Sequence, residues 1–245
     1  MSKLSFRVIG AGRAGGAMAR ALTKVGWIER AALGRNDDVT HAASDVDVLI
    51  VATPDAAIAT VASAIAPNPN CCVVHLSGAL GADVLAPHPR RATVHPLVAL
   101  PDAHTGARRL LDGAWFALTV GGDAMGAAIV DALGGRRVAL ADSEQVRALH
   151  HAACCVAANH LTTLLGQVER LAAAAGVPVD AYLALARGAV VNVADVGAAA
   201  ALTGPIARGD WVTVDRHRAA VDAAAPAERE LYEALVTATR DLAEC

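Results

Sequence analysis

A glycine-rich loop near the start of the chain has the spacing of a dinucleotide-binding turn. An apolar run, Phe6 to Ile9, precedes the loop, and a segment with helical character, Gly16 to Val25, follows it. In such loops the first glycine makes the tight turn, the second lets the backbone approach a pyrophosphate, and the third permits close helix–strand packing. The helix N-terminus adds unpaired N–H groups and a positive dipole. The residues expected to contact the phosphates are Gly10, Gly12, Arg13, Ala14 and Gly15.

The choice between NAD and NADP is made about 20 residues past such a loop, at the end of the second strand. An NAD site would place Asp or Glu there, whereas this sequence has Gly34-Arg35-Asn36. A small residue followed by arginine leaves room for a ribose 2′-phosphate and supplies a guanidinium to bind it. Arg35 therefore predicts NADP. Two alternatives stay open: Arg35 is an ordinary surface charge, or Asp37 or Asp38 binds the ribose.

Polar residues follow three further apolar runs: Thr53-Pro54-Asp55, Ser77-Gly78 and His95-Pro96. Ligands of open α/β sheets bind beyond the carboxyl ends of the strands. We therefore expect Thr53, Pro54 and Ser77 at the nicotinamide–ribose end of the cofactor, with Ser77 also near the substrate. His95 could hydrogen-bond a substrate. The alternatives are that these residues cap a helix, close a turn, or pack in a loop.

A long helical stretch in the second half carries polar and small residues at spacings of three or four, which would place them on one helix face. His151 and Asn159 could donate hydrogen bonds to a carbonyl oxygen, and histidine is suited to proton transfer near neutral pH. For Cys155 and Gly166 packing is the simpler interpretation. The residues in the row are His151, Cys155, Asn159, Thr162 and Gly166.

The first half must contain the strands that position the glycine loop. Continuous apolar runs of strand length are typical of a parallel sheet covered on both faces. Their alternation with helical segments predicts a doubly wound α/β Rossmann domain over residues 1–142. The expected strands are Phe6–Ile9, Ala31–Gly34, Asp47–Ala52, Cys71–Leu76, Ala92–Val94 and Trp115–Val120.

The second half, residues 143–245, predicts an all-α domain, which we expect to bind the substrate. A helix is expected from Ser143 to about Ala175, where Gly176-Val177-Pro178 ends it. Further helices are expected over residues 180–196, 213–224 and 226–243. An irregular segment, residues 202–210, lies between them, and this half shows no strand pattern.

Composition excludes several classes of protein. The chain has 245 residues, 55% of them hydrophobic, 3% aromatic, with a net charge of -3. A basic stripe and aromatic stacking platforms are both lacking, so we expect no nucleic-acid partner. We also expect no membrane span, no signal peptide and a cytoplasmic location. The five cysteines are expected to be reduced, and neither they nor the nine histidines suggested a metal site.

The chain resembles the 6-phosphogluconate-dehydrogenase-like superfamily. Within it, the resemblance is to a Rossmann-like reductase family long classed as a domain of unknown function, which includes alternative ketopantoate reductases. The resemblance implies an NADP-dependent reductase, often dimeric through the helical domain. The stretches that carry it are VIGAGRAGGAMARAL, VATPD, HLSGAL, HPLVAL, HHAACCVAANHLTTLL and ALTGPIARGD, spanning residues 8–210.

Departures from the family pattern bear on catalysis. Relatives usually carry an aromatic residue where this chain has His150. Some enzymes of the superfamily use a lysine as proton donor. The only lysines of this chain are Lys3 and Lys24, and neither lies in the helical half. His151 is then the first choice of proton donor and His95 the second, with Asn159 orienting the substrate; water held by these groups is a further alternative.

Two more residues are substrate candidates. The Arg208 guanidinium could bind a carboxylate in a two-pronged geometry. Its alternatives are a salt bridge with Asp210 or a contact across a dimer interface. Asn192 is similar to an asparagine of the family and could face the same cleft.

The leading functional hypothesis is hydride transfer from NADPH to a small carboxylate-bearing ketone such as ketopantoate. The alternatives are reduction of a cyclic imine, as in pyrroline-carboxylate reductases, and hydride exchange with a deazaflavin. A different class is a non-catalytic NADP sensor or assembly protein that keeps the fold for binding alone.

Overall fold

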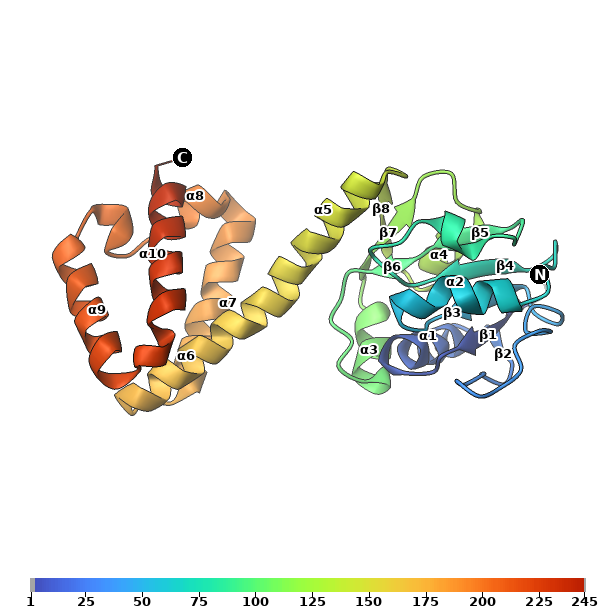
Figure 1. The fold of residues 1–245 in the computed structure, drawn as a ribbon, viewed down its shortest axis with the longest axis horizontal. Coiled ribbons are helices and arrows are strands. Elements are labelled where there is room, and N and C mark those ends of the chain that lie inside the picture. Colours follow the sequence, from blue (N-terminus) through green and yellow to red (C-terminus); the bar gives the residue numbers. More distant parts are fainter. Residues whose placement is uncertain (1–2, 245) are drawn as a thin grey trace. The chain divides into compact units, whose positions relative to one another are not determined.

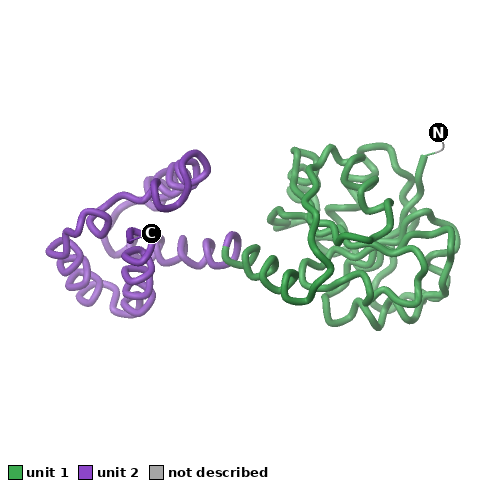
Figure 2. The backbone as a smooth tube through the Cα atoms, turned by 90° about the horizontal axis from the view of Figure 1, so that it is seen from above, with its two compact units in different colours: residues 1–156 green, residues 157–245 purple. Residues whose placement is uncertain are grey.

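The computed structural model describes residues 3–244, which form two compact units that divide between residues 156 and 157 (Figure 2). The sequence placed the domain boundary earlier, at residue 142. The two boundaries differ by the helix α5 (Glu144–Cys155), which belongs to the first unit in the structure. A Cβ added at Gly81 would lie 2.9 Å from the Arg147 guanidinium carbon, and His150 of α5 hydrogen-bonds His95.

The first unit, the Rossmann unit (residues 3–156), is built on a five-stranded parallel sheet in the order β2-β1-β3-β4-β5 (Figure 1). The predicted doubly wound α/β class is therefore confirmed. A second, three-stranded sheet has the order β6-β7-β8, with β6 antiparallel and β8 parallel to β7. The strands are β1 Ser5–Ile9, β2 Ile28–Glu29, β3 Val48–Val51, β4 Cys72–His75, β5 Arg91–Thr93, β6 His95–Pro96, β7 Trp115–Thr119 and β8 Arg136–Leu140.

Each face of the five-stranded sheet has its own apolar core, because side chains alternate along a strand. Val48 and Ile50 of β3 pack with α1 (Arg13–Lys24), α3 (Ala103–Leu110) and α4 (Met125–Ala132). Leu49 and Val51 of the same strand pack on the opposite face with α2 (Asp55–Ala64). Because helices cover both faces of the sheet, β3 is fully buried and its sequence is apolar throughout.

One strand prediction was wrong, and one strand of the structure was missed. The second strand is β2, at residues 28–29, rather than Ala31–Gly34, where only Leu33 forms a single bridge with Ile9. The strand β8 was not expected. Its residues are almost all exposed and it begins with two arginines, so it lacks the apolar run by which the other strands were found.

The second unit, the helical unit (residues 157–244), has no strand among its described residues, as predicted. The long predicted helix is present as α5, a π-helical segment (Val156–His160) and α6 (Leu161–Ala175), which Gly176 ends with a φ of 68°. Two 3-10 turns, Ile206–Arg208 and Pro226–Glu228, precede the last two helices. The remaining helices are α7 Val179–Val196, α8 Ala198–Ala201, α9 Trp211–Ala224 and α10 Arg229–Ala243.

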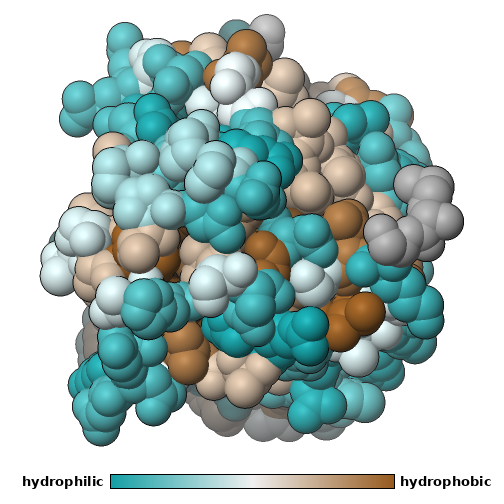
Figure 3. All heavy atoms as spheres, turned by 90° about the vertical axis from the view of Figure 1, so that its right-hand side faces the viewer, coloured by the Kyte–Doolittle hydropathy of each residue, from teal (hydrophilic) through white to brown (hydrophobic). Residues whose placement is uncertain are grey.

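The surfaces of the two units differ in character. On the face of the Rossmann unit in Figure 3, hydrophilic and apolar residues are interspersed. By contrast, α7 exposes a row of large apolar side chains and has no buried residue. None of the helices in residues 3–244 is long and apolar enough to cross a membrane.

Candidate functional site

The carboxyl ends of four strands lie side by side at one edge of the parallel sheet. Ile9, Val51, His75 and Thr93 are neighbours in the register of β1, β3, β4 and β5. The residues that follow these ends are therefore brought to the same edge. These residues include the glycine loop, Thr53, Ser77 and His95, which the sequence singled out.

The glycine loop has the backbone geometry that its spacing predicts. Gly10 has a φ of 89°, and a Cβ there would lie 2.8 Å from the carbonyl oxygen of Ala52. A Cβ at Gly15 would collide with the carbonyl oxygen of Gly10 and lie 2.9 Å from Val8 Cγ1. Gly12 differs, because a Cβ there would meet no atom within 4 Å. Gly10 and Gly15 are thus needed for packing, while Gly12 leaves open space in front of the backbone.

The N-terminus of α1 faces this open space without an internal anion. Gly12 is the N-cap and supplies no side chain, and no acidic residue lies in the first turn. The first helical hydrogen bond of the turn runs from Gly16 N to Gly12 O at 2.8 Å, so the N–H groups before Gly16 have no helical partner. This arrangement fits the phosphates of a dinucleotide.

Arg35 lies next to the glycine loop because the segment after β2 runs alongside the end of β1. Leu33 N donates to Val8 O, and Gly10 N donates to Leu33 O, each at 2.9 Å. Both acidic alternatives are engaged locally: Asp37 Oδ2 accepts from Gly34 N at 2.7 Å, and Asp38 Oδ1 accepts from Thr40 N at 2.8 Å. Arg35 is exposed and forms no ion pair within residues 3–244. Its guanidinium is therefore free to bind a 2′-phosphate.

Thr53 and Pro54 lie where β3 meets α2. Pro54 is the N-cap of α2. The Thr53 hydroxyl oxygen is buried and has no hydrogen-bond partner among the described residues. An unsatisfied buried hydroxyl is costly unless something else bonds it. Since Thr53 adjoins Gly10, a cofactor that follows the loop would pass close to this hydroxyl.

Ser77 is held in an internal network rather than left free. Its hydroxyl donates to Asp55 Oδ2 at 2.7 Å and accepts from Ala79 N at 3.1 Å and Leu80 N at 3.3 Å. The residue is 8% exposed. This geometry favours the turn-closing alternative, and direct contact of Ser77 with cofactor or substrate stays a prediction.

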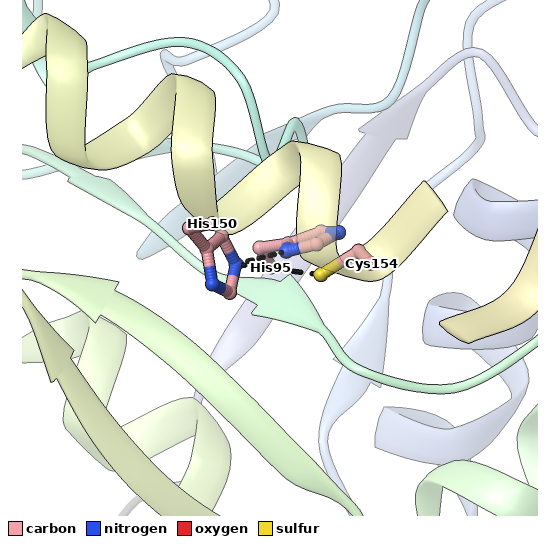
Figure 4. Close-up of side chains that lie close together, drawn as sticks. All are labelled: His95, His150 and Cys154. Carbon is pink, nitrogen blue, oxygen red and sulfur yellow. Dashed lines mark hydrogen bonds between the residues drawn. The ribbon is translucent and has the colours of Figure 1, made fainter. Parts of the chain in front are cut away.

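His95 belongs to a cluster with two side chains of α5 that the sequence reading did not connect to it (Figure 4). Its Nδ1 lies 3.2 Å from His150 Nε2, and Cys154 Sγ lies 3.7 Å from the same Nε2. The two rings are nearly perpendicular, with centroids 5.4 Å apart. The spacing of His150 and Cys154, four residues apart on a helix, is the sequence signal that could have revealed them.

Gly78 determines where the His95 ring can lie. A Cβ at Gly78 would lie 2.5 Å from His95 Cε1 and 2.7 Å from its Nδ1. The ring therefore packs directly on the glycine backbone, a position that a side chain at residue 78 would block.

The imidazoles of this cluster are neutral at pH 7. Burial, with smaller contributions from the neighbouring His150 and His151, lowers the pKa of His95 to about 4. Burial and His151 also lower the pKa of His150. A neutral His95 is a hydrogen-bond donor or a ligand rather than a charged acid.

Of the remaining candidates, His151 lies near His95 and His150, where it lowers the pKa of both. His151 is half-buried in α5. The row predicted from His151 to Gly166 is interrupted, because the π-helical segment changes the turn from i→i+4 to i→i+5 bonds. Asn159 and Asn192 are exposed in the helical unit, so their roles toward a substrate stay predictions.

Arg208 is exposed in the 3-10 turn before α9. The salt bridge considered for it with Asp210 is not formed, because the Asp210 carboxylate caps α9. It accepts from Thr213 N at 3.1 Å and from the Thr213 hydroxyl at 2.7 Å. Arg208 therefore remains available for a carboxylate or for an interface.

The four described cysteines are free thiols, as expected. Cys71 and Cys72 are buried in the sheet, and burial raises the pKa of each to about 12. Cys154 and Cys155 are half-buried in α5. Cys245 lies outside the described residues.

Comparison with known families identifies the second half of the chain. Residues 120–239 match the family described as a domain of unknown function, DUF2520. Just under half of the chain is thus similar to this family. This match confirms the family resemblance stated from the sequence motifs, and it runs from α4 and β8 through the following helices into α10. Comparison with curated protein sequences finds no match.

Solved structures share the whole fold. A candidate NADP oxidoreductase of Bacteroides fragilis is 22% identical, with a TM-score of 0.79 over 98% of both chains. A protein of Thermotoga maritima is 23% identical, with a TM-score of 0.71 over 98% of both chains. A reductive aminase of Aspergillus terreus, in complex with NADPH4, cyclohexanone and allyl amine, is 18% identical. Its TM-score is 0.71 over 99% of this chain and 98% of its own.

Proposed function

We propose that this protein is an NADPH-dependent reductase that transfers hydride to a small carbonyl or imine compound. The observation that carries the proposal is the glycine loop. Gly10 and Gly15 hold the turn against the sheet, while Gly12 leaves the space that a pyrophosphate needs. The fold shared with a candidate NADP oxidoreductase and with a reductive aminase bound to NADPH4 supports the same conclusion.

The geometry beside the loop favours NADPH over NADH. Arg35 is unpaired within the described residues, while Asp37 and Asp38 each accept a backbone hydrogen bond. A guanidinium favours the 2′-phosphate of NADP, and the two carboxylates each have a local backbone partner, which Arg35 lacks.

The first candidate substrate is a carboxylate-bearing ketone such as ketopantoate. Hydride would pass from the nicotinamide to the carbonyl carbon, and the oxygen would take a proton. His151 is the preferred donor of that proton, because the pKa of about 4 keeps His95 neutral and suited to hydrogen bonding. Arg208 is the candidate for the substrate carboxylate. Positioning and electrostatic preorganisation would supply most of the barrier reduction.

An imine is the second candidate substrate, because the reductive aminase of Aspergillus terreus shares this fold over nearly the whole chain. Imine reduction differs in its electrostatics, since the protonated imine is itself a cation and needs no alkoxide stabilisation. An amine product that forms only when ketone and amine are supplied together would identify this activity.

The test is NADPH oxidation by the purified protein with ketopantoate, other 2-keto acids, and ketone–amine mixtures, each repeated with NADH. Turnover of any of these acceptors with NADPH preferred supports the proposal. Isothermal titration with NADPH checks cofactor binding separately. Failure to bind NADPH would overturn the cofactor assignment, whereas binding without turnover would overturn the reductase assignment for these substrates and favour a sensor.

A further inference from the structure

The cluster of His95, His150 and Cys154 has the composition and geometry of a metal site. We propose that these three side chains bind a zinc ion through His95 Nδ1, His150 Nε2 and Cys154 Sγ. This site goes beyond the proposed reductase activity and does not depend on it. It also revises the expectation of no metal site, which considered histidine pairs along the sequence and not a histidine brought in from a strand.

Two of the three separations between the ligand atoms agree with tetrahedral zinc coordination. Zinc binds histidine nitrogen at about 2.0–2.1 Å and cysteine sulfur at about 2.3 Å, so tetrahedral geometry separates two nitrogens by about 3.3 Å and nitrogen from sulfur by about 3.6 Å. The observed separations are 3.2 Å for the two nitrogens and 3.7 Å for His150 Nε2 to Cys154 Sγ. All three ligand atoms lie within 4.8 Å of one another.

Hydrogen bonding alone satisfies this cluster poorly. His150 Nε2 faces both His95 Nδ1 and Cys154 Sγ. A single ring nitrogen offers either one hydrogen or one lone pair, so it serves both neighbours only by sharing. A cation between the three atoms takes one lone pair from each of them, and the neutral imidazoles described above have that lone pair available.

The supports of the cluster are rigid. Four residues separate His150 from Cys154, which places both on one face of α5. His95 lies in β6, and its ring is held against the backbone of Gly78. The site is therefore preorganised by a helix and a strand of the same unit (Figure 4).

The ligand set favours zinc over the harder cations. Imidazole and thiolate ligands suit zinc, whereas magnesium and calcium prefer oxygen. Three protein ligands leave the fourth position open for water or a substrate oxygen, as in catalytic rather than structural zinc sites. All three side chains are half-buried, so an ion has access. With Nδ1 of His95 on the metal, its Nε2 would carry the hydrogen and remain a donor.

The experiment is metal titration of the untagged protein, because a histidine tag would itself bind the ion. The protein is stripped with chelator, dialysed, and titrated with Zn²⁺ by calorimetry and with Co²⁺ by absorption. We expect one ion per chain and, with Co²⁺, the d–d bands of a four-coordinate site together with a thiolate-to-cobalt charge-transfer band.

Matched variants assign the ligands. Cys154→Ser should abolish the charge-transfer band and weaken Zn²⁺ binding by more than about tenfold, since it removes the soft ligand. His150→Phe should weaken binding similarly. Cys155→Ser, at the next position of α5, should keep both the band and the affinity. Thermal unfolding checks each fold, and Zn²⁺ should raise the Tm of the parent and of Cys155→Ser but not of Cys154→Ser.

Two results would overturn the site: no stoichiometric Zn²⁺ binding by the parent protein, or a charge-transfer band that survives Cys154→Ser. Neither result bears on NADPH binding, which is measured in the absence of added metal. The metal site and the proposed reductase function can therefore fail independently.

Discussion

At the scale of single residues, Arg35 carries the choice of cofactor. Arg35→Ala should raise the KM for NADPH by about 10- to 100-fold, because a charge-assisted hydrogen bond contributes about 1.5–3 kcal/mol. The KM for NADH should hardly change. Initial rates with both cofactors measure this, or binding titrations if no substrate is found. Arg216→Ala, another exposed arginine, is the control and should leave both values unchanged. Equal losses for NADPH and NADH would contradict the assignment.

Gly12 and Gly15 offer a matched pair of substitutions at the same scale. Gly12→Ala meets open space at a φ of -73°, so the fold should keep its Tm while NADPH binding is lost through the added methyl. Gly15→Ala should lower the free energy of unfolding by about 1–3 kcal/mol, since its Cβ collides with a backbone oxygen. Alanine normally stabilises a helix relative to glycine, so the sign is diagnostic. Thermal melts and NADPH titrations separate the two effects.

At the scale of elements, prediction succeeded where a pattern was local. The strands β3 and β4 could be predicted because burial on both faces requires apolar residues. The end of α6 could be predicted because a positive φ favours glycine, here Gly176. The strand β8 was missed because it is exposed and begins with two arginines. The π-helical segment breaks the predicted row from His151 to Gly166, and His95 meets α5 only through tertiary packing. Neither follows from sequence spacing.

Also at this scale, an ion pair joins the segment before β5 to the turn before α4. Arg90 Nε donates to Asp123 Oδ2 at 2.9 Å, and Met125 N donates to Asp123 Oδ1 at the same distance. The Arg90 guanidinium holds the pKa of Asp123 below its usual value. A lowered folded-state pKa contributes stability above the unfolded value of about 3.9. That contribution is lost as pH falls through the folded value.

Asp123→Asn should therefore lower the free energy of unfolding by about 1 kcal/mol at pH 7, a figure reduced for the partial exposure of the pair. The difference from the parent should shrink below about pH 4, where the carboxylate becomes protonated first in the unfolded chain and, at lower pH, also in the folded protein. Denaturant unfolding at several pH values measures it. Asp131→Asn is the control, because its pair with Arg137 is exposed and spans 3.4 Å. A pH-independent difference for Asp123→Asn would refute the electrostatic explanation.

At the scale of the whole molecule, α7 stands out because none of its residues is buried in the single chain. Its apolar residues are exposed in the single chain: Leu185 by 71%, Val196 by 59% and Val190 by 57%. An apolar row of this kind on a monomer marks an interaction surface. The family resemblance implies dimers through the helical domain, so we expect a second copy to cover α7. A homodimer interface of this kind would be largely hydrophobic and symmetric.

Light scattering after size exclusion should therefore give twice the 24.8 kDa mass of the chain. Leu185→Asp should shift the protein toward monomer, because a carboxylate would be buried without a partner in the dimer. Val120→Lys is the control: Val120 is 59% exposed in the Rossmann unit, so this substitution should leave the mass unchanged.

NADPH binding and turnover by the Leu185→Asp monomer then show whether the dimer is needed for cofactor binding or for the substrate site. Retained affinity with lost turnover would mean that the helical units complete the substrate site across the dimer. A parent protein that runs as a monomer would leave α7 for another partner and would contradict the dimer.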